Sequence, residues 1–130
     1  MEKKDFINVK EVRVDEQRAI MEQIVKDGVC PFCMENFTRY HKQPILRDGE
    51  RWILTPSQWP YENTKHHFLA VSKKHIERIE ELQAEDITEL LEHFKWANKE
   101  YEFPGGAFFM RFGNMKYNGS SVAHLHAQLL

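Results

Sequence analysis

The last eight residues of the chain, AHLHAQLL, contain an alternation of polar and apolar side chains that few structures can satisfy. His124, His126 and Gln128 occupy every second position, and a leucine and an alanine lie between them. Positions two apart point about 200° from each other around a helix, whereas they line a single face of a strand. The alternation therefore predicts a strand over 121–130, with its apolar face on a core and two imidazoles and a carboxamide on its polar face.

The rest of the chain predicts a mixture of helices and short strands. Apolar periodicity predicts helices over 14–27, 76–82 and 84–103, with Gly28 ending the first of them. Apolar runs predict a hairpin around Asp48-Gly49 and strands over 67–72 and 106–113. Since the strands do not alternate regularly with helices, we expect an α+β domain, an antiparallel sheet with helices packed on it.

Individual side chains can be assigned to faces in the same way. On the helix over 14–27, Val25 is expected to share one buried face with Ile20 and Ile24. His93 falls on the polar side of the long helix, and His41 is expected at the surface. The buried stripe of that long helix is assigned to Ile87, Leu90, Leu91, Phe94 and Trp96.

Composition and charge exclude several classes of protein. The chain has 130 residues, enough for one domain with a sizeable core, and its 42% hydrophobic and 29% charged residues are ordinary for a globular protein. A net charge of −2 without any block of like charge argues against a nucleic-acid partner. No apolar run reaches membrane-spanning length and the start MEKKDF does not resemble a signal peptide, so we expect a cytoplasmic protein without a membrane partner.

The motif CPFC places Cys30 and Cys33 at the spacing of a metal site or a thiol redox pair. Two thiolates at this spacing can bind one zinc ion, with two further ligands from elsewhere in the chain. A thioredoxin-type redox pair is the alternative, but that motif normally opens a helix after the first strand of a βαβ unit. Here a predicted helix precedes the motif and no βαβ pattern follows, which favours zinc.

Several segments together resemble the histidine triad (HIT) superfamily. HLHAQLL resembles its signature His-x-His-x-His-x-x, with Gln128 in the third position, as in the galactose-1-phosphate uridylyltransferase branch and in diadenosine-polyphosphate phosphorylases. CPFC, TKHHFLAVSKKHI (64–76) and NMKYNGSSVAHLHAQ (114–128) resemble further family segments in the same order. The resemblance divides the chain into a HIT-like domain over 30–130 and an N-terminal helical extension over 1–29.

The resemblance implies a reaction and a set of site residues. His126 would attack the α-phosphorus of a nucleotide or dinucleoside polyphosphate and form a covalent nucleotidyl-histidine intermediate, with His124 and Gln128 as further catalytic residues. A structural zinc ion and a homodimer are also implied. The implied zinc ligands are Cys30, Cys33, His75 and His124, and the implied substrate-binding residues are Asn114, Ser120, Ser121 and His67.

Three questions stay open at the level of the sequence. Glutamine cannot titrate, so Gln128 favours transfer of the nucleotidyl group to phosphate or a sugar phosphate. A hydrolase and a transferase both stay open as predictions. The resemblance implies an acidic residue shortly after the hairpin, but LTPSQWPYEN (54–63) contains no aspartate and only Glu62. This difference and Gln128 make a non-catalytic nucleotide-binding zinc domain the second hypothesis. Ser120 and Ser121 fit plain turn chemistry equally well, and Trp52, Trp59 and Tyr61 fit either base stacking or packing.

Overall fold

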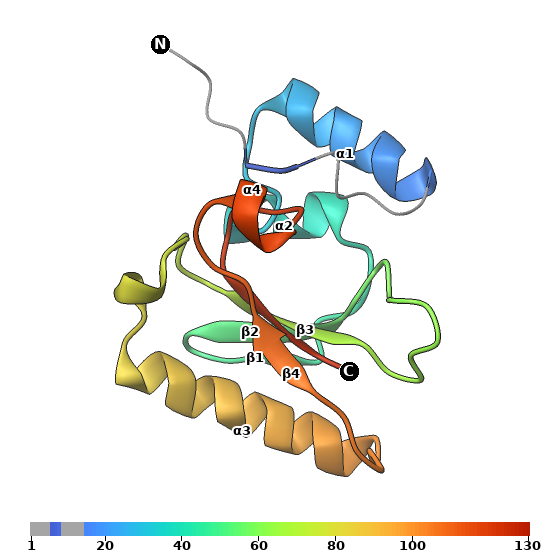
Figure 1. Ribbon diagram of the computed structural model, residues 1–130, viewed down its shortest axis with the longest axis vertical. Helices are drawn as coiled ribbons and strands as arrows, with labels where there is room; N and C mark the ends of the chain where they lie inside the picture. Colours follow the sequence, from blue (N-terminus) through green and yellow to red (C-terminus); the bar gives the residue numbers. More distant parts are fainter. Residues whose placement is uncertain (1–5, 9–14) are drawn as a thin grey trace.

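The centre of the molecule is a five-stranded sheet with the strand order β1-β2-β3-β5-β4 (Figure 1). This computed structural model describes residues 6–8 and 15–130. All four pairings between neighbouring strands are antiparallel, which confirms the predicted α+β class. The strands are β1 (Arg47–Asp48), β2 (Trp52–Pro56), β3 (Phe68–Ser72), β4 (Phe108–Met110) and β5 (His126–Leu129).

Helices lie on both sides of this sheet. Figure 1 shows α3 along one side, and α1, α2 and α4 beyond the other. The helix predicted over 14–27 is found from residue 15 onward, and residue 14 lies outside the described residues. The helix predicted over 76–82 is wrong, because only a short 3-10 turn forms there. The helical elements are α1 (Asp15–Asp27), α2 (Met34–Tyr40), η2 (Ile79–Glu81), α3 (Ala84–Glu100) and α4 (Met115–Asn118). Among the described residues, none of the helices has the length and apolar character that a membrane crossing requires.

The main core lies between α3 and one face of the sheet. Strand residues alternate between the two faces, so every second residue of β2, β3 and β5 reaches this core. Helix α3 covers them with Leu90, Phe94 and Ala97. The strand residues buried here are Trp52, Leu54, Phe68, Ala70, Ala127 and Leu129. Ala127 and Leu129 of AHLHAQLL therefore pack on the core as the alternation predicts.

The buried stripe of α3 differs from the predicted one. Ile87 and Leu91 are 46% and 49% exposed, whereas His93, predicted on the polar side, is only 2% exposed. The neighbouring Glu89 explains the rotation, because its carboxylate accepts backbone N–H groups at the β1–β2 hairpin, including that of Trp52 at 2.8 Å. Nε2 of His93 lies 3.1 Å from the same carboxylate, so both polar groups face the sheet.

A second layer covers the opposite face of the sheet. Ile53, Leu69 and Val71 pack there against Phe37 of α2. Helix α1 adds its own buried face, in which Met21 and Ile24 contact Ile7, Tyr40 and Val122. Val25, predicted to share this face, is 45% exposed. Gly28 ends α1 as predicted, with a left-handed φ of 68° and an N–H that donates to the carbonyl of Ile24 at 2.9 Å.

Candidate functional site

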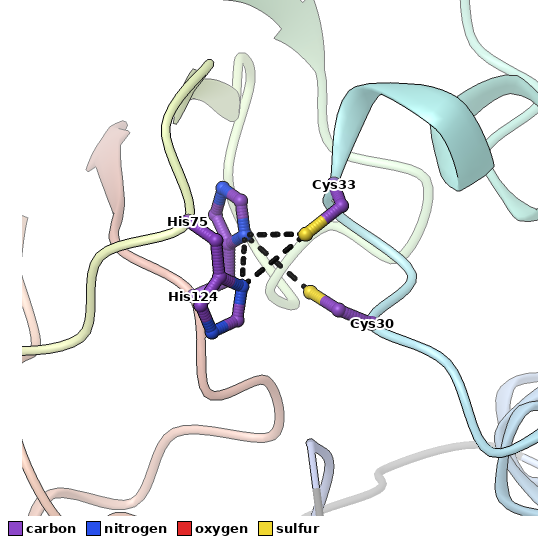
Figure 2. A group of neighbouring side chains, drawn as sticks. All are labelled: Cys30, Cys33, His75 and His124. Atoms are coloured by element: carbon purple, nitrogen blue, oxygen red, sulfur yellow. Dashed lines mark hydrogen bonds between the residues drawn. The ribbon is translucent and has the colours of Figure 1, made fainter.

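Four potential metal ligands meet beside the start of β5. The ligand atoms of Cys30, Cys33, His75 and His124 all lie within 4.8 Å of one another. Figure 2 shows the two sulfurs facing the two imidazoles. The four residues come from three separate parts of the chain, since the two cysteines share one turn. Nδ1 of His124 lies 3.4 Å from Sγ of Cys30 and 3.1 Å from Nδ1 of His75. Sγ of Cys33 lies 3.3 Å from Nδ1 of His75 and 3.8 Å from Nδ1 of His124. The predicted zinc ligands therefore come together.

The spacing and chemistry of these donors fit zinc. A tetrahedral ion with Zn–S of about 2.3 Å and Zn–N of about 2.0–2.1 Å needs ligand separations of roughly 3.3–3.8 Å, close to those observed. The outer nitrogens hold both rings in place, because Nε2 of His124 donates to the carbonyl of Ser72 at 2.6 Å. Nε2 of His75 likewise lies 2.8 Å from the carboxylate of Glu77. These bonds leave both Nδ1 lone pairs facing the sulfurs, as metal-ligating histidines require.

The electrostatics of the two thiols depend on a bound cation. Burial raises the pKa of Cys30, and burial together with the neighbouring Cys30 thiol raises the pKa of Cys33 to about 12. A coordinating metal reverses this, because a thiol bound to a metal is deprotonated outright. Four protein donors fill a tetrahedral shell and leave no position for substrate, so the set is of the structural kind.

A cavity of about 280 Å³ opens beside this cluster, on the face of the sheet opposite α3. Five predicted site residues line it: His67, Ser120, Ser121, His126 and Gln128. His124 does not, because regular strand structure begins only at His126 and the His124 ring turns to the cysteines. The predicted strand over 121–130 was therefore too long, and of its two imidazoles only that of His126 shares the cavity with the carboxamide of Gln128.

His126 has the geometry of a nucleophile. Its Nδ1–H donates to the carbonyl of His124 at 2.8 Å, which leaves the lone pair on Nε2. The ring is 9% exposed, and burial lowers its pKa to about 4, so the imidazole is neutral at pH 7. The charge of Arg111 lowers this pKa further. Phe32, inside the CPFC motif, packs edge-on against the ring with centroids 4.9 Å apart.

Gln128 is oriented by a chain of hydrogen bonds that begins in the loop before β3. The backbone N–H of Tyr61 donates to Nδ1 of His67 at 3.1 Å, so the proton of this imidazole resides on Nε2. Nε2–H in turn donates to Oε1 of Gln128 at 2.7 Å. With its oxygen engaged, the carboxamide has its NH2 group left to donate toward the cavity. His67, predicted to bind substrate, thus has both ring nitrogens bonded to the protein.

The remaining predicted substrate contacts separate into three cases. The hydroxyl of Ser120 donates to the carbonyl of Val122 at 2.9 Å, which is the turn chemistry left open by the sequence. Ser121 lines the cavity half-buried, and its hydroxyl has no hydrogen bond to any described residue. Asn114 instead caps α4, where its Oδ1 accepts the N–H of Lys116 at 2.9 Å, and it borders a different hollow beside Glu77. The structure therefore keeps Ser121 near His126 and places Asn114 elsewhere.

Other residues of the cavity were missed or misplaced by the sequence. His41, predicted at the surface, is 8% exposed, and its Nε2 lies 2.8 Å from Oγ1 of Thr55. Trp59 and Tyr61 line the cavity, whereas Trp52 is a core residue. Arg111 and the inner face of α1, including Gln17 and Met21, also line it. A polar residue among the apolar positions of α1 was a signal for Gln17, but no sequence motif pointed to Arg111.

Known proteins resemble this chain in structure rather than in sequence. No protein-family model matches it, and neither does any curated protein. A HIT family hydrolase from Legionella pneumophila superimposes with a TM-score of 0.63 at 20% identity, covering 78% of this chain and 91% of that one. The chain has the histidine triad fold.

Two further HIT proteins extend the comparison. A histidine triad nucleotide-binding protein from Candida albicans gives a TM-score of 0.64 at 17% identity, and 78% of this chain covers 73% of that one. A zinc-bound histidine triad family protein from Mycobacterium smegmatis gives 0.62 at 18% identity with the same coverage. The resemblance drawn from HLHAQLL, CPFC and the segments between them is thereby confirmed for the HIT fold.

Proposed function

We propose that this HIT-fold protein is a nucleotidyl hydrolase or transferase that acts on nucleotide phosphoanhydrides through His126. The observation that carries the proposal is Nε2 of His126, which forms no hydrogen bond with any described residue and belongs to a ring that lines the cavity, while Nδ1 is fixed by the carbonyl of His124. A neutral imidazole with its lone pair free on Nε2 is a competent nucleophile at pH 7. The names of similar folds, a hydrolase and a nucleotide-binding protein, support a nucleotide as the ligand.

The proposed reaction has two steps. In the first, the Nε2 lone pair attacks the α-phosphorus, a phosphorus–nitrogen bond forms, and the bridging oxygen departs with its bonding electrons on the leaving phosphate. In the second, water or phosphate attacks the same phosphorus, the phosphorus–nitrogen bond breaks and its electron pair returns to Nε2. When water is the acceptor, its proton is released to solvent. The NH2 group of Gln128 and the hydroxyl of Ser121 are the neutral donors available to the phosphoryl oxygens.

Gln128 shapes the choice of acceptor. A carboxamide can orient and donate hydrogen bonds, but it cannot take a proton from water as an imidazole would. This favours an acceptor that is already an anion, such as phosphate, over water. We therefore propose a phosphorylase-like transferase as the first form of the activity and a hydrolase as the second.

Zinc has a structural role in this proposal. Cys30, Cys33, His75 and His124 would hold it, and the ion would supply a rigid tie between the N-terminal turn and the catalytic segment. The tie matters for His126 because the carbonyl of the ligand His124 fixes its tautomer. The Mycobacterium smegmatis protein, described as zinc-bound, supports this assignment. Cytoplasmic location, homodimerisation and a domain boundary at residue 29 stay predictions drawn from the sequence and its resemblance.

Incubation with a dinucleoside polyphosphate, with and without inorganic phosphate, tests the proposal. We expect faster turnover with phosphate. We also expect a nucleotidyl adduct on the protein in mass spectra, in samples whose reaction is stopped without acid so that the phosphorus–nitrogen bond survives. His126→Ala should lower turnover by at least about 10³-fold while the protein stays folded. His66→Ala is the matched control, because His66 stacks on Phe103 with centroids 5.2 Å apart, away from the cavity. Full turnover by His126→Ala would overturn the proposal, and tight nucleotide binding without product would favour a binding module instead.

A further inference from the structure

Among the described residues that line the cavity, one carries a formal charge. Arg111 is the one arginine or lysine of this described lining, and it includes no aspartate or glutamate. The other polar groups around His126 are amides, hydroxyls and imidazoles. A cavity with one fixed cation and no carboxylate is suited to an anionic group.

Arg111 is held in place without being neutralised. It follows β4 directly, and its Nη1 donates to the hydroxyl of Tyr61 at 3.0 Å. Its guanidinium carbon lies 4.8 Å from the centroid of the Phe109 ring. Among the described residues, no carboxylate lies within ion-pair distance of Arg111, although six other ion pairs form elsewhere. A half-buried guanidinium with a neutral partner and an aromatic support has donors left for an oxyanion.

The neutral character of Gln128 makes this charge important. The donors near His126 can stabilise phosphoryl oxygens, but none of them is an acid that could protonate a departing group. A departing phosphate does not need a proton if its new negative charge is paired. A departing amine, by contrast, does need one, and a guanidinium cannot supply it.

We infer that Arg111, oriented by Tyr61, binds the departing phosphate and selects substrates with at least two linked phosphates over nucleoside phosphoramidates. The inference deepens the proposed function and rests on it for the reaction step. In that step the bridging phosphorus–oxygen bond breaks, both electrons stay on oxygen, and the resulting oxyanion pairs with the guanidinium. Arg111 keeps its protons throughout, so this step needs no acid to protonate the leaving group.

Two substrates and five proteins, one of them a control variant, test the inference. We would measure kcat/KM for a dinucleoside polyphosphate and for a nucleoside 5′-phosphoramidate with wild type, Arg111→Gln, Arg111→Lys and Tyr61→Phe. Arg111→Gln should lower kcat/KM for the dinucleotide by about 100-fold, and for the phosphoramidate by less than about 3-fold. Lysine should restore part of the loss, and Tyr61→Phe should give a smaller loss of the same selectivity. Arg47→Gln is the matched control, because Arg47 lies over Trp96 on the α3 side of the sheet.

Binding of inorganic pyrophosphate, measured by calorimetry, gives a readout that does not depend on turnover. Wild type and Arg47→Gln should bind it equally, and Arg111→Gln should bind it at least about 10-fold more weakly. Equal losses on both substrates, or unchanged pyrophosphate binding in Arg111→Gln, would overturn the inference even if the enzyme is active. If wild type turns over neither substrate, the proposed function fails, and the pyrophosphate measurement still decides whether Arg111 forms an anion site.

Discussion

The two faces of the sheet are built from the same strands but have opposite characters. On the α3 face, Ala127 and Leu129 of β5 enter the main apolar core, whose polar neighbours His93 and Glu89 lie toward the β1–β2 hairpin. On the other face, His126 pairs in register with Val71, and Gln128 with Leu69. Because neighbours along a strand point to opposite faces, one four-residue strand contributes to stability on one side and to chemistry on the other. Substitutions one residue apart should therefore have different kinds of effect.

The site face carries more polar groups than the α3 face and needs a different source of stability. Beside two smaller apolar clusters, the Cys2His2 cluster ties the segment that carries His124 and His126 to the CPFC turn. Removing zinc by chelation, or by Cys30→Ser, should lower the free energy of unfolding by on the order of 5 kcal/mol or more. Denaturant unfolding with metal analysis checks this, and added zinc should restore the chelated wild type but not the variant. Less than one zinc per chain in a fully stable protein would contradict it.

The α3 face should respond to loss of apolar volume alone. Phe94 is 4% exposed in the core and Leu91, three residues earlier on the same helix, is 49% exposed. Phe94→Ala should destabilise the protein by about 3–5 kcal/mol, and Leu91→Ala by less than about 0.5 kcal/mol. Turnover per folded molecule should be unchanged in both, since neither residue reaches the cavity. If urea unfolding gave similar losses of unfolding free energy for the two variants, α3 would not pack through the Leu90–Phe94 stripe.

The sequence was sufficient where spacing alone determines geometry. The alternation in AHLHAQLL identified both faces of β5, and the Asp48-Gly49 turn located the first hairpin. The zinc ligands could be predicted because CPFC, His75 and His124 belong to motifs whose order is characteristic of one family. The alternation and the turn are local patterns with one structural solution, whereas CPFC alone left zinc and a redox pair open and the full ligand set came from the family resemblance.

The remaining site depends on tertiary contacts that leave no local pattern. The rotation of α3 follows from hydrogen bonds between Glu89 and the hairpin, 37 and 38 residues away in sequence. Arg111 is held at the cavity by its hydrogen bond to the hydroxyl of Tyr61, which lies 50 positions earlier in the sequence. His41 is buried because the ring stacks on Phe37, with centroids 4.6 Å apart, and bonds to Thr55. Such pairings are specified by the assembled fold and cannot be read from one segment.

Burial of His41 should make stability depend on pH. Burial lowers its pKa from 6.5 to about 4, so between these values the unfolded chain binds a proton that the folded chain does not. The contribution is present above pH 6.5 and is lost as pH falls to 4, in total roughly 3 kcal/mol. Glutamine at position 41 can keep a hydrogen bond to Thr55 without titrating. The difference in unfolding free energy between wild type and His41→Gln, measured from pH 7 to pH 4, should therefore shrink or reverse by this amount, and a constant difference would contradict the assignment.

The smallest expected effect concerns the site face alone, where our proposal has His67 affect catalysis only through Gln128. Its Nε2–H holds the carboxamide oxygen, so His67→Ala should let the amide rotate and lower kcat by about 10–100-fold with little change in KM. A double-mutant cycle separates this positioning role from a direct one. In a Gln128→Ala background, His67→Ala should cost almost nothing further, because there is no amide left to orient. If the two losses instead multiply, His67 contacts substrate directly, and the hydrogen-bond chain from Tyr61 is a packing feature rather than a means of aiming the amide.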